Sequence, residues 1–396
     1  MTRIIAFTGF LVIWNLGFTQ DLVVTNARII VGTGQTIEQG SVVVRDGRIA
    51  SVFAGATEAQ GGLVINADGM TVMPGLIDSH THLLISDRMM LDGEAALSRW
   101  ISEELPGHLE AYLASGVTTV LSHGDYFPEI AEVKRLAEHG ELRAPRLLVS
   151  GPFLTTSDGH PIRMLCDGAP ALCRASLIAE IDDPGAARAK VRELAEAGVD
   201  AIKIVYDDGF RRDPRPKLND EVLFAIADEA QRHGLPLIAH ARETADALRV
   251  IEFESVRLAH PPVLGAGDLA EIGQILRDTS IPFATTSNSS GLDGIQALWE
   301  AGATIAFGTD GFSSGPRAAV AREIEMISRV LSPAQVIAAV TRNAAAYVGL
   351  SDEIGTLEPG KLADIVIIDG DPLADVSDLS NMEIVIQGGR IVVDNR

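Results

Sequence analysis

Short apolar runs alternate with longer stretches of helical periodicity between about residues 74 and 349. This alternation is typical of repeated βα units, and eight runs are the number needed to close a (β/α)8 TIM barrel. The eight runs begin at Leu76, Val117, Arg146, Ala201, Pro236, Val256, Ile281 and Thr304. Between two of them, residues 219–233 are expected to form a helix, with Asn219 as its N-cap and Gly234 as its stop.

The two ends of the chain follow a different pattern, in which apolar and polar positions alternate between Gly-rich turns. The alternating stretches are residues 21–30, 41–53, 63–66, 360–369 and 383–393. They predict short antiparallel strands. We therefore expect a small β-sandwich domain built from residues 21–73 and 350–396, with the barrel over 74–349.

Residues 1–20 have a short basic start and then an apolar run that ends at Phe18. The run is too short and too interrupted to span a bilayer, so no stable membrane span is expected. It predicts a signal peptide, a mature chain that begins close to Asp21, and a periplasmic or secreted protein. Gly17 and Thr19 are small but not the ideal cleavage residues, so an uncleaved segment on a cytoplasmic protein is the alternative.

Only two cysteines are present, Cys166 and Cys173, in a loop rich in Pro, Gly and Asp. In an exported protein they could pair and pin this loop, whereas in the cytosol they would stay thiols. Metal ligation by these cysteines is the less favoured interpretation.

Composition narrows the range of partners. The chain has 396 residues, 46% of them hydrophobic, which is enough for a large core. Its 54 acidic and 32 basic residues give a formal charge of -22, which repels phosphate backbones and argues against a nucleic-acid partner. The acidic residues are scattered and not in a block, which favours a solvated surface. Homo-oligomer formation stays open.

Polar residues close several of the apolar runs. His80 and His82 end the first run, and alternate residues of a strand share a face, so both imidazoles can converge on one metal ion. Lys203 lies in the fourth run, and His240, His260 and Asp310 end the fifth, sixth and eighth. Active sites of such barrels lie at the carboxyl ends of the strands.

Each of these residues also has a structural alternative. Histidines can be hydrogen-bonded core residues, a lysine can extend its amine to solvent, and an aspartate can cap the following helix. Their coincidence at one barrel mouth favours a metal centre.

Six segments together carry a family resemblance. They are Val72-Met-Pro-Gly-Leu-Ile-Asp-Ser-His-Thr-His82, Gly198-Val-Asp-Ala-Ile-Lys-Ile204, Ile238-Ala-His-Ala241, Arg257-Leu-Ala-His260, Phe307-Gly-Thr-Asp310 and Glu358-Pro-Gly-Lys-Leu-Ala-Asp364. From about residue 21 to 396 the chain resembles the metal-dependent amidohydrolase superfamily, in the branch of imidazolonepropionase-like and Xaa-Pro dipeptidase-like enzymes. Imidazolonepropionase itself lacks the strand-four lysine, so Lys203 argues for a binuclear site.

The resemblance implies a role for each of these residues. Lys203 would be carboxylated and bridge two divalent ions, His80, His82 and Asp310 would hold the first ion, and His240 and His260 would hold the second. Asp310 would also move a proton from the attacking hydroxide to the leaving nitrogen. Lys203 and Asp310 are thus the catalytic candidates within the ligand set.

Elementary chemistry is consistent with these roles. A lysine in a dry barrel loses proton affinity, and its neutral amine can take up carbon dioxide to form an anionic carbamate. Nitrogen and oxygen ligands without thiolate suit zinc, although cobalt or manganese would fit the same set. The predicted function is hydrolysis of an amide-type C–N bond in a small molecule, such as a dipeptide, an Xaa-Pro substrate or an N-acyl amino acid, by a metal-bridging hydroxide.

Two alternatives remain, a lactone or ester hydrolase on the same site and an inactive relative that acts as a binding scaffold. The complete ligand set favours an enzyme. Loops after barrel strands carry specificity, so His123, His160, Arg163 and Arg242 are candidates for substrate contact. Surface hydrogen bonds or salt bridges are the alternative for each of them.

Overall fold

The computed structural model describes residues 21–57, 62–85, 93–169, 171–209, 214–262, 268–287, 291–312 and 315–396. The predicted leader, residues 1–20, lies outside these ranges. Within them, no helix has both the length and the apolar character that a membrane crossing requires.

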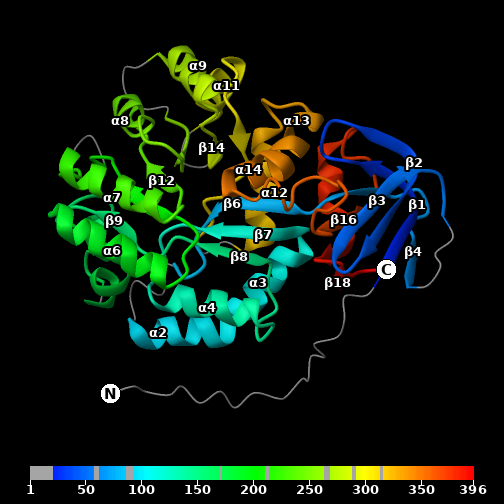
Figure 1. The fold of residues 1–396 in the computed structure, drawn as a ribbon, viewed down its shortest axis with the longest axis horizontal. Coiled ribbons are helices and arrows are strands. Elements are labelled where there is room, and N and C mark those ends of the chain that lie inside the picture. The colour runs from blue at the N-terminus through cyan, green and yellow to red at the C-terminus, as the bar shows by residue number, and fades with distance from the viewer. Residues whose placement is uncertain are drawn as a thin grey trace.

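Eight parallel strands form the centre of the larger domain (Figure 1). Each of the eight predicted apolar runs contains one of them, and the predicted barrel with an added β domain is confirmed. The strands are β6 (Leu76–Thr81), β7 (Val117–Ser122), β8 (Arg146–Val149), β11 (Ile202–Val205), β12 (Leu237–His240), β13 (Val256–Leu258), β14 (Phe283–Ala284) and β15 (Ile305–Ala306).

Hydrogen bonds join these strands in two groups, β6 to β8 and β11 to β15. At one seam Ser79 N–H donates to the Phe307 carbonyl at 2.9 Å, and Asp310 N–H donates to the His80 carbonyl at 2.8 Å. At the other seam Asp200 N–H donates to the Val149 carbonyl at 2.8 Å. The sequence did not predict two short strands beside β11, namely β9 (Phe153–Thr155) and β10 (Ile178–Glu180).

Helices surround this barrel. They are α2 (Glu94–Arg99), η1 (Trp100–Glu104), α3 (Leu105–Ala114), α4 (Glu129–Glu138), α5 (Ile162–Cys166), η2 (Cys173–Leu177), α6 (Pro184–Glu196), α7 (Asp220–Arg232), α8 (Thr244–Val250), α9 (Leu269–Thr279), α11 (Leu292–Glu300), α12 (Pro316–Ile327), α13 (Pro333–Ala338), η3 (Ala339–Asn343) and α14 (Ala344–Val348). Helix α7 matches its prediction, because the Asn219 side chain accepts the Val222 N–H at 2.9 Å.

The two ends of the described chain form a second domain, in which blue and red strands lie side by side (Figure 1). A single eight-stranded sheet contains β1 (Leu22–Ile30), β2 (Thr36–Arg45), β3 (Arg48–Ala54), β4 (Leu63–Asn66), β5 (Thr71–Pro74), β16 (Ile365–Ile368), β17 (Met382–Gln387) and β18 (Arg390–Asp394), and a short 3-10 helix, η4 (Val376–Ser380), precedes β17.

Two details of this domain correct the sequence prediction. Residues 41–53 and 383–393 are hairpins and not single strands, because the chain turns at Gly47 and at Gly388–Gly389, where φ is positive. The strands are also not all antiparallel, since β4 and β5 both pair with β1 in parallel. Strand β1 pairs with β2 on one side and with β4 and β5 on the other, so the chain crosses β1 after the β2–β3 hairpin.

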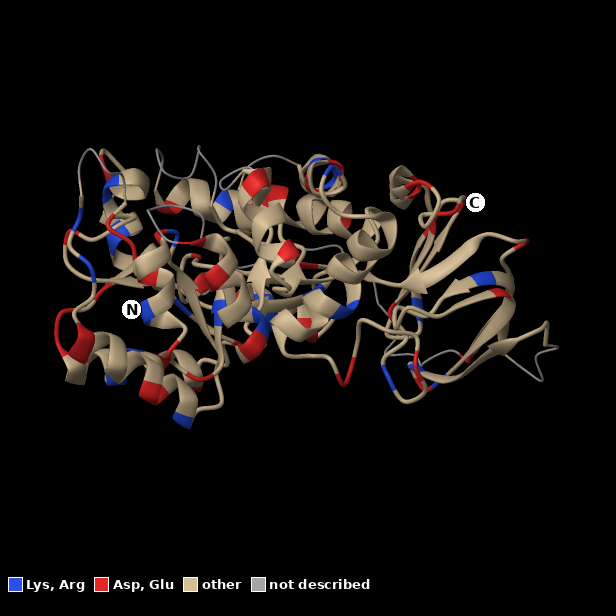
Figure 2. Cartoon of the chain, turned by 90° about the horizontal axis from the view of Figure 1, so that it is seen from above, with Lys and Arg blue, Asp and Glu red and all other residues tan. Residues whose placement is uncertain are grey.

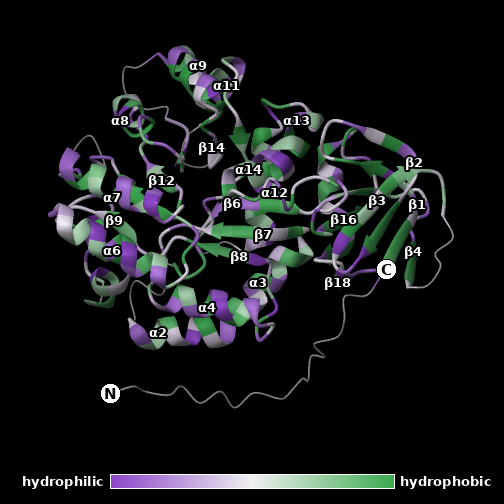
Figure 3. Cartoon of the chain, viewed as in Figure 1, coloured by the Kyte–Doolittle hydropathy of each residue, from purple (hydrophilic) through white to green (hydrophobic). Residues whose placement is uncertain are grey.

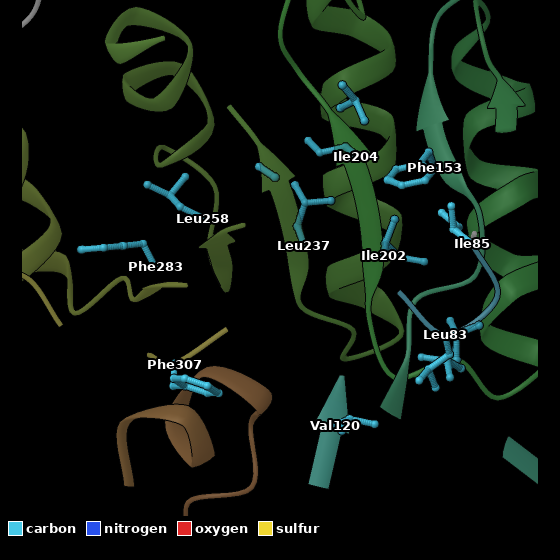
Figure 4. Close-up of a cluster of buried hydrophobic side chains, with 14 of the residues drawn as sticks. Leu83, Ile85, Val120, Phe153, Ile202, Ile204, Leu237, Leu258, Phe283 and Phe307 are labelled. Atoms are coloured by element: carbon cyan, nitrogen blue, oxygen red, sulfur yellow. The ribbon is translucent and has the colours of Figure 1, made fainter. Parts of the chain in front are cut away.

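Apolar side chains form three cores. The largest lies between the barrel strands and the helices, and Figure 4 shows Ile202, Leu237, Leu258 and Phe283 in it. A smaller core fills the inside of the barrel, and the third lies within the β domain. Strands are accordingly mostly hydrophobic in Figure 3, whereas the outer helices are striped. Acidic and basic residues are distributed along the outer helices and loops (Figure 2).

The amino ends of the barrel strands face the β domain. Asp364, which is 4% exposed, accepts a hydrogen bond from Arg146 Nη1 at 2.6 Å and from Gly388 N–H at 2.8 Å. Arg146 Nη1 also donates to Thr119 Oγ1 at 2.9 Å, and the Gly75 N–H donates to the Asp364 carbonyl at 2.9 Å. The two domains are therefore joined through a satisfied, largely buried polar network.

Candidate metal centre

All six predicted metal ligands line one cavity at the carboxyl ends of the barrel strands. The cavity has a volume of about 410 Å³, and the ligands in its wall are His80, His82, Lys203, His240, His260 and Asp310. They come from β6, the middle of β11, the end of β12, and the turns after β13 and β15. The barrel topology thus gathers residues that are up to 230 positions apart in sequence.

The first half of the site consists of two histidines around one carboxylate. Asp310 Oδ1 lies 3.3 Å from His80 Nε2 and 3.2 Å from His82 Nε2. The other ring nitrogens face carbonyl oxygens, with His80 Nδ1 at 2.8 Å from Ala259 O and His82 Nδ1 at 3.4 Å from Gly124 O. A carbonyl only accepts, so we assign the ring protons to Nδ1, which leaves both Nε2 lone pairs directed at the carboxylate.

Burial and neighbouring charges shift the pKa values of these groups. Burial lowers the pKa of His80 to about 4, so its ring is neutral at pH 7. Burial opposes ionisation of Asp310, and the surrounding histidines His80, His82 and His260 hold its pKa well below the ordinary value only when their rings carry protons, whose positive charge a bound cation would replace. Two lone pairs and a negative charge then meet without a proton between them. A divalent cation would satisfy all three. His260 of the other half of the site also lies near, since candidate ligand atoms of His80, His260 and Asp310 all lie within 4.8 Å of one another.

The second half of the site contains His240 and His260, whose ring centres are 4.6 Å apart. Burial lowers the pKa of both well below the ordinary value. His260 Nδ1 lies 2.9 Å from Thr286 Oγ1, which leaves Nε2 for a metal ion. His240 Nε2 lies 3.6 Å from Asp207 Oδ2, which leaves Nδ1 on the opposite side of the ring.

Lys203 is 1% exposed, and burial lowers its pKa to about 7. Among the residues that the structure describes, Nζ has no carboxylate ion pair, and its hydrogen-bond neighbour is His123 Nδ1 at 3.4 Å. A large fraction of the amine is therefore neutral near pH 7. This is the form that can react with carbon dioxide.

Several buried carboxylates support the ligands, and the sequence analysis did not select them. Asp78 accepts the Thr309 N–H at 3.0 Å and the Thr309 hydroxyl at 2.6 Å, next to Asp310. Asp125 accepts the Leu84 N–H at 2.9 Å, just after His82. Burial raises the pKa of Asp78 to about 7 and that of Asp125 to about 6. Asp78 interrupts an apolar run, which is a signal that could have identified it, whereas Asp125 follows the end of β7 and has no such signal.

Two of the four candidate substrate contacts line the cavity, and two do not. His160 and Arg242 line it, together with Asp207 and Glu243. His123 is fully buried against Lys203 and is not among the lining residues, because the end of β7 directs it toward the barrel interior. Arg163 faces outward from α5 with a side chain that is 58% exposed, 3.2 Å from Asp167, and it does not line the cavity either.

Another part of the cavity wall is apolar. The Phe312 ring stacks on His82 at 4.4 Å, and the Phe153 ring lies 5.7 Å from His82. Helix α5 adds Met164 and Leu165 to this wall. A disulfide between Cys166 and Cys173 closes the end of α5 onto η2, with a Cα–Cα distance of 5.5 Å. The cysteine loop is thus pinned beside the cavity.

The chain is similar to known proteins over most of its length. The model of the amidohydrolase family matches residues 71–392. An imidazolonepropionase from Sphingopyxis alaskensis is 27% identical over 88% of this chain and 92% of its own length. A 5-methylthioadenosine/S-adenosylhomocysteine deaminase from Natronomonas pharaonis is 25% identical over 89% of this chain and 88% of its own. The crystal structure of a prolidase complexed with N-methylphosphonate-L-proline superimposes with a TM-score of 0.81 at 22% identity, covering 94% of this chain and all of the other.

Proposed function

The chain belongs to the amidohydrolase family and is a metal-dependent hydrolase of C–N bonds, and we propose that its substrates are dipeptides, Xaa-Pro substrates among them, or N-acyl amino acids. The observation that carries this proposal is the convergence of unprotonated ligand atoms in one cavity that has an apolar and a charged wall.

Two divalent ions fit the six ligands better than one. His80, His82 and Asp310 would hold the first ion, and His240 and His260 the second, with a carbamate on Lys203 between them. The support is the position of Lys203, a buried amine whose pKa falls to about 7 and which has no carboxylate partner among the described residues. Zinc suits this nitrogen and oxygen donor set, and cobalt and manganese are chemically close.

Bound ions of this kind would supply hydroxide near neutral pH and polarise the substrate carbonyl. The protein's own residues then orient the substrate and move the proton. Asp310 is the carboxylate among the candidate ligands. It can therefore accept the proton of the attacking water and deliver it to the departing nitrogen. An amide nitrogen leaves poorly unless it is protonated, so this transfer is essential for an amide.

The two walls indicate how a substrate would lie. Arg242 offers a cation for a carboxylate, and His160, whose pKa burial lowers to about 4, offers a neutral hydrogen-bonding ring beside it. Phe153, Phe312 and Met164 form the apolar wall, and Met164 is 50% exposed despite its size. A substrate with an apolar side chain or acyl group at one end and a carboxylate at the other matches this cavity.

Metal analysis together with a substrate screen tests the proposal. We expect two divalent ions per chain and cleavage of dipeptides or N-acyl amino acids. Lys203→Ala should retain at most one ion and lose most of the activity. A wild-type stoichiometry near one, or a fully active Lys203→Ala protein with two ions, would remove the bridging role. Arg163→Ala, which changes an exposed residue outside the cavity, is the matched control.

A further inference from the structure

Thr286 has a backbone conformation that is unusual for its residue type. Its φ is +38°, in the left-handed region, where a β-branched side chain crowds the backbone. The residue is completely buried, two positions after β14 ends at Ala284. Such strain persists only where the surroundings impose it, and it often accompanies a functional site.

Two sets of hydrogen bonds hold Thr286 in this conformation. Its N–H donates to the Gly308 carbonyl at 3.0 Å. The next residue, Ser287, is clamped by Glu323 of α12, whose carboxylate accepts the Ser287 N–H at 3.0 Å and the Ser287 hydroxyl at 2.6 Å. Glu323 is 1% exposed, so a carboxylate is kept out of water to make these bonds.

The strained conformation places the Thr286 hydroxyl 2.9 Å from His260 Nδ1. A partner on Nδ1 fixes the rotation of the imidazole and leaves Nε2 as the nitrogen that faces the cavity. Glu323 therefore reaches His260 through Ser287 and Thr286, across two loops and one helix.

We propose that Thr286 is a positioning residue for the second metal ion and that Glu323 acts on His260 through it. This inference rests on the proposed binuclear centre, because it assigns His260 to the second ion. The Thr286 hydroxyl orients His260, and the Glu323–Ser287 clamp holds Thr286 in the conformation that allows it.

The test is the affinity of each zinc site, measured by elemental analysis of holoprotein equilibrated at a series of free Zn²⁺ concentrations. Thr286→Val removes the hydroxyl and keeps the shape of the side chain. We expect the second Zn²⁺ to bind about 10–100-fold more weakly while the first is much less affected. Thr286→Ser keeps the hydroxyl and should restore the affinity to near the wild-type value.

Glu323→Gln should weaken the same Zn²⁺ site, and the double variant should bind no more weakly than Thr286→Val alone, because both changes act through one hydroxyl. Glu229→Gln is the matched control, since Glu229 is a buried carboxylate on the outer helix α7 that pairs with Arg188 and Arg192. It should leave both zinc affinities unchanged even where the protein melts earlier.

Two results would overturn the inference, and they differ from each other. If the wild-type protein binds two ions and Thr286→Val binds both with unchanged affinity, the role of Thr286 is wrong and the binuclear centre stands. If the wild-type protein binds a single ion, the binuclear centre fails, and the role of Thr286 fails with it. Additive losses in the double variant would show that Glu323 does not act through Thr286.

Discussion

The buried polar groups at the two ends of the barrel differ in whether they have partners within the protein. At the amino end, Arg146 and Asp364 satisfy each other, with Thr119 and Gly388 completing the network. At the carboxyl end, His80, His82 and Asp310 direct acceptors at one another. The amino end is complete within the protein, whereas the carboxyl end requires a cation. We therefore expect mutations at the amino end to change stability and mutations of the candidate metal ligands at the carboxyl end to change chemistry.

The largest effect is expected for Asp310→Asn. Loss of the proton transfer should lower amide turnover by ~10²–10⁴-fold, and an ester with a good leaving group should suffer less because it needs no proton. Rates are to be compared at matched metal occupancy, since Asn also weakens the first ion. Wild-type amide turnover in a fully metallated variant would require another proton carrier, with His160, which lines the cavity, the next residue to test in place of the buried His123.

The next effect is a pH dependence of stability that Glu323 creates at the carboxyl end. Burial raises its pKa from 4.5 to about 7, so the unfolded chain loses this proton first as the pH rises. The stability that protonated Glu323 contributes is therefore fully present below about pH 4.5 and is lost as the pH rises through about 7.

Glu323→Gln removes that slope. Between pH 5 and pH 8, the free energy of unfolding of the variant should rise by about 2 kcal/mol relative to that of the wild-type protein. Urea unfolding of the metal-free proteins measures this difference. Glu325→Gln, on the exposed face of the same helix, is the matched control. A difference between Glu323→Gln and wild type that does not change with pH would contradict the prediction.

Asp364→Ala tests the amino end. It leaves Arg146 and the Gly388 N–H without their acceptor, and we expect the free energy of unfolding to fall by about 2 kcal/mol. This figure is discounted for solvent screening, because the Arg146 side chain is 25% exposed. The activity of the molecules that remain folded should equal that of the wild-type protein. Glu38→Ala removes an 80% exposed partner of Arg28 and should cost less than about 1 kcal/mol. A loss of kcat in Asp364→Ala at low temperature would show that the two ends are not independent.

The smallest effect on chemistry is expected from the disulfide beside the cavity. Replacing Cys166 and Cys173 by serine frees the end of α5, which carries Met164 and Leu165, so KM for apolar substrates should rise severalfold while kcat changes little. Steady-state kinetics measures this split, and an equal fall in kcat would mean that the loop supports the metal site instead.

Mass spectrometry of the native protein tests the oxidised state separately. We propose export on the basis of the leader and this disulfide, and the expected product has paired cysteines and begins close to Asp21. Free thiols together with an intact Met1 would place the enzyme in the cytosol.

The sequence indicated the strands and the candidate ligands for one reason, that a polar residue within or at the end of a buried apolar run is visible without a structure. His240 and Asp310 end such runs, Lys203 lies within one, and all three line the cavity. Thr286 could not be found in this way, because its role depends on a backbone angle and on Glu323, which is 37 positions later.

Side-chain direction was equally hidden from the sequence. His123 and His160 both lie in loops after strands, yet one packs against Lys203 and the other lines the cavity. Only the packing of neighbouring strands separates the two cases. The parallel pairing of β4 and β5 with β1 likewise depends on where the chain crosses the sheet, which alternation cannot reveal.

The shared sheet also has a consequence for how the protein is made. Strand β5 pairs with β16, and Val72 meets Ile367, a residue translated about 295 positions later. At translation rates of ~5–20 residues per second, that interval lasts roughly 15–60 s. During this time β1, β2 and β5 have been synthesised but present an open edge and an incomplete core. The early strands therefore expose apolar surface until β16 emerges.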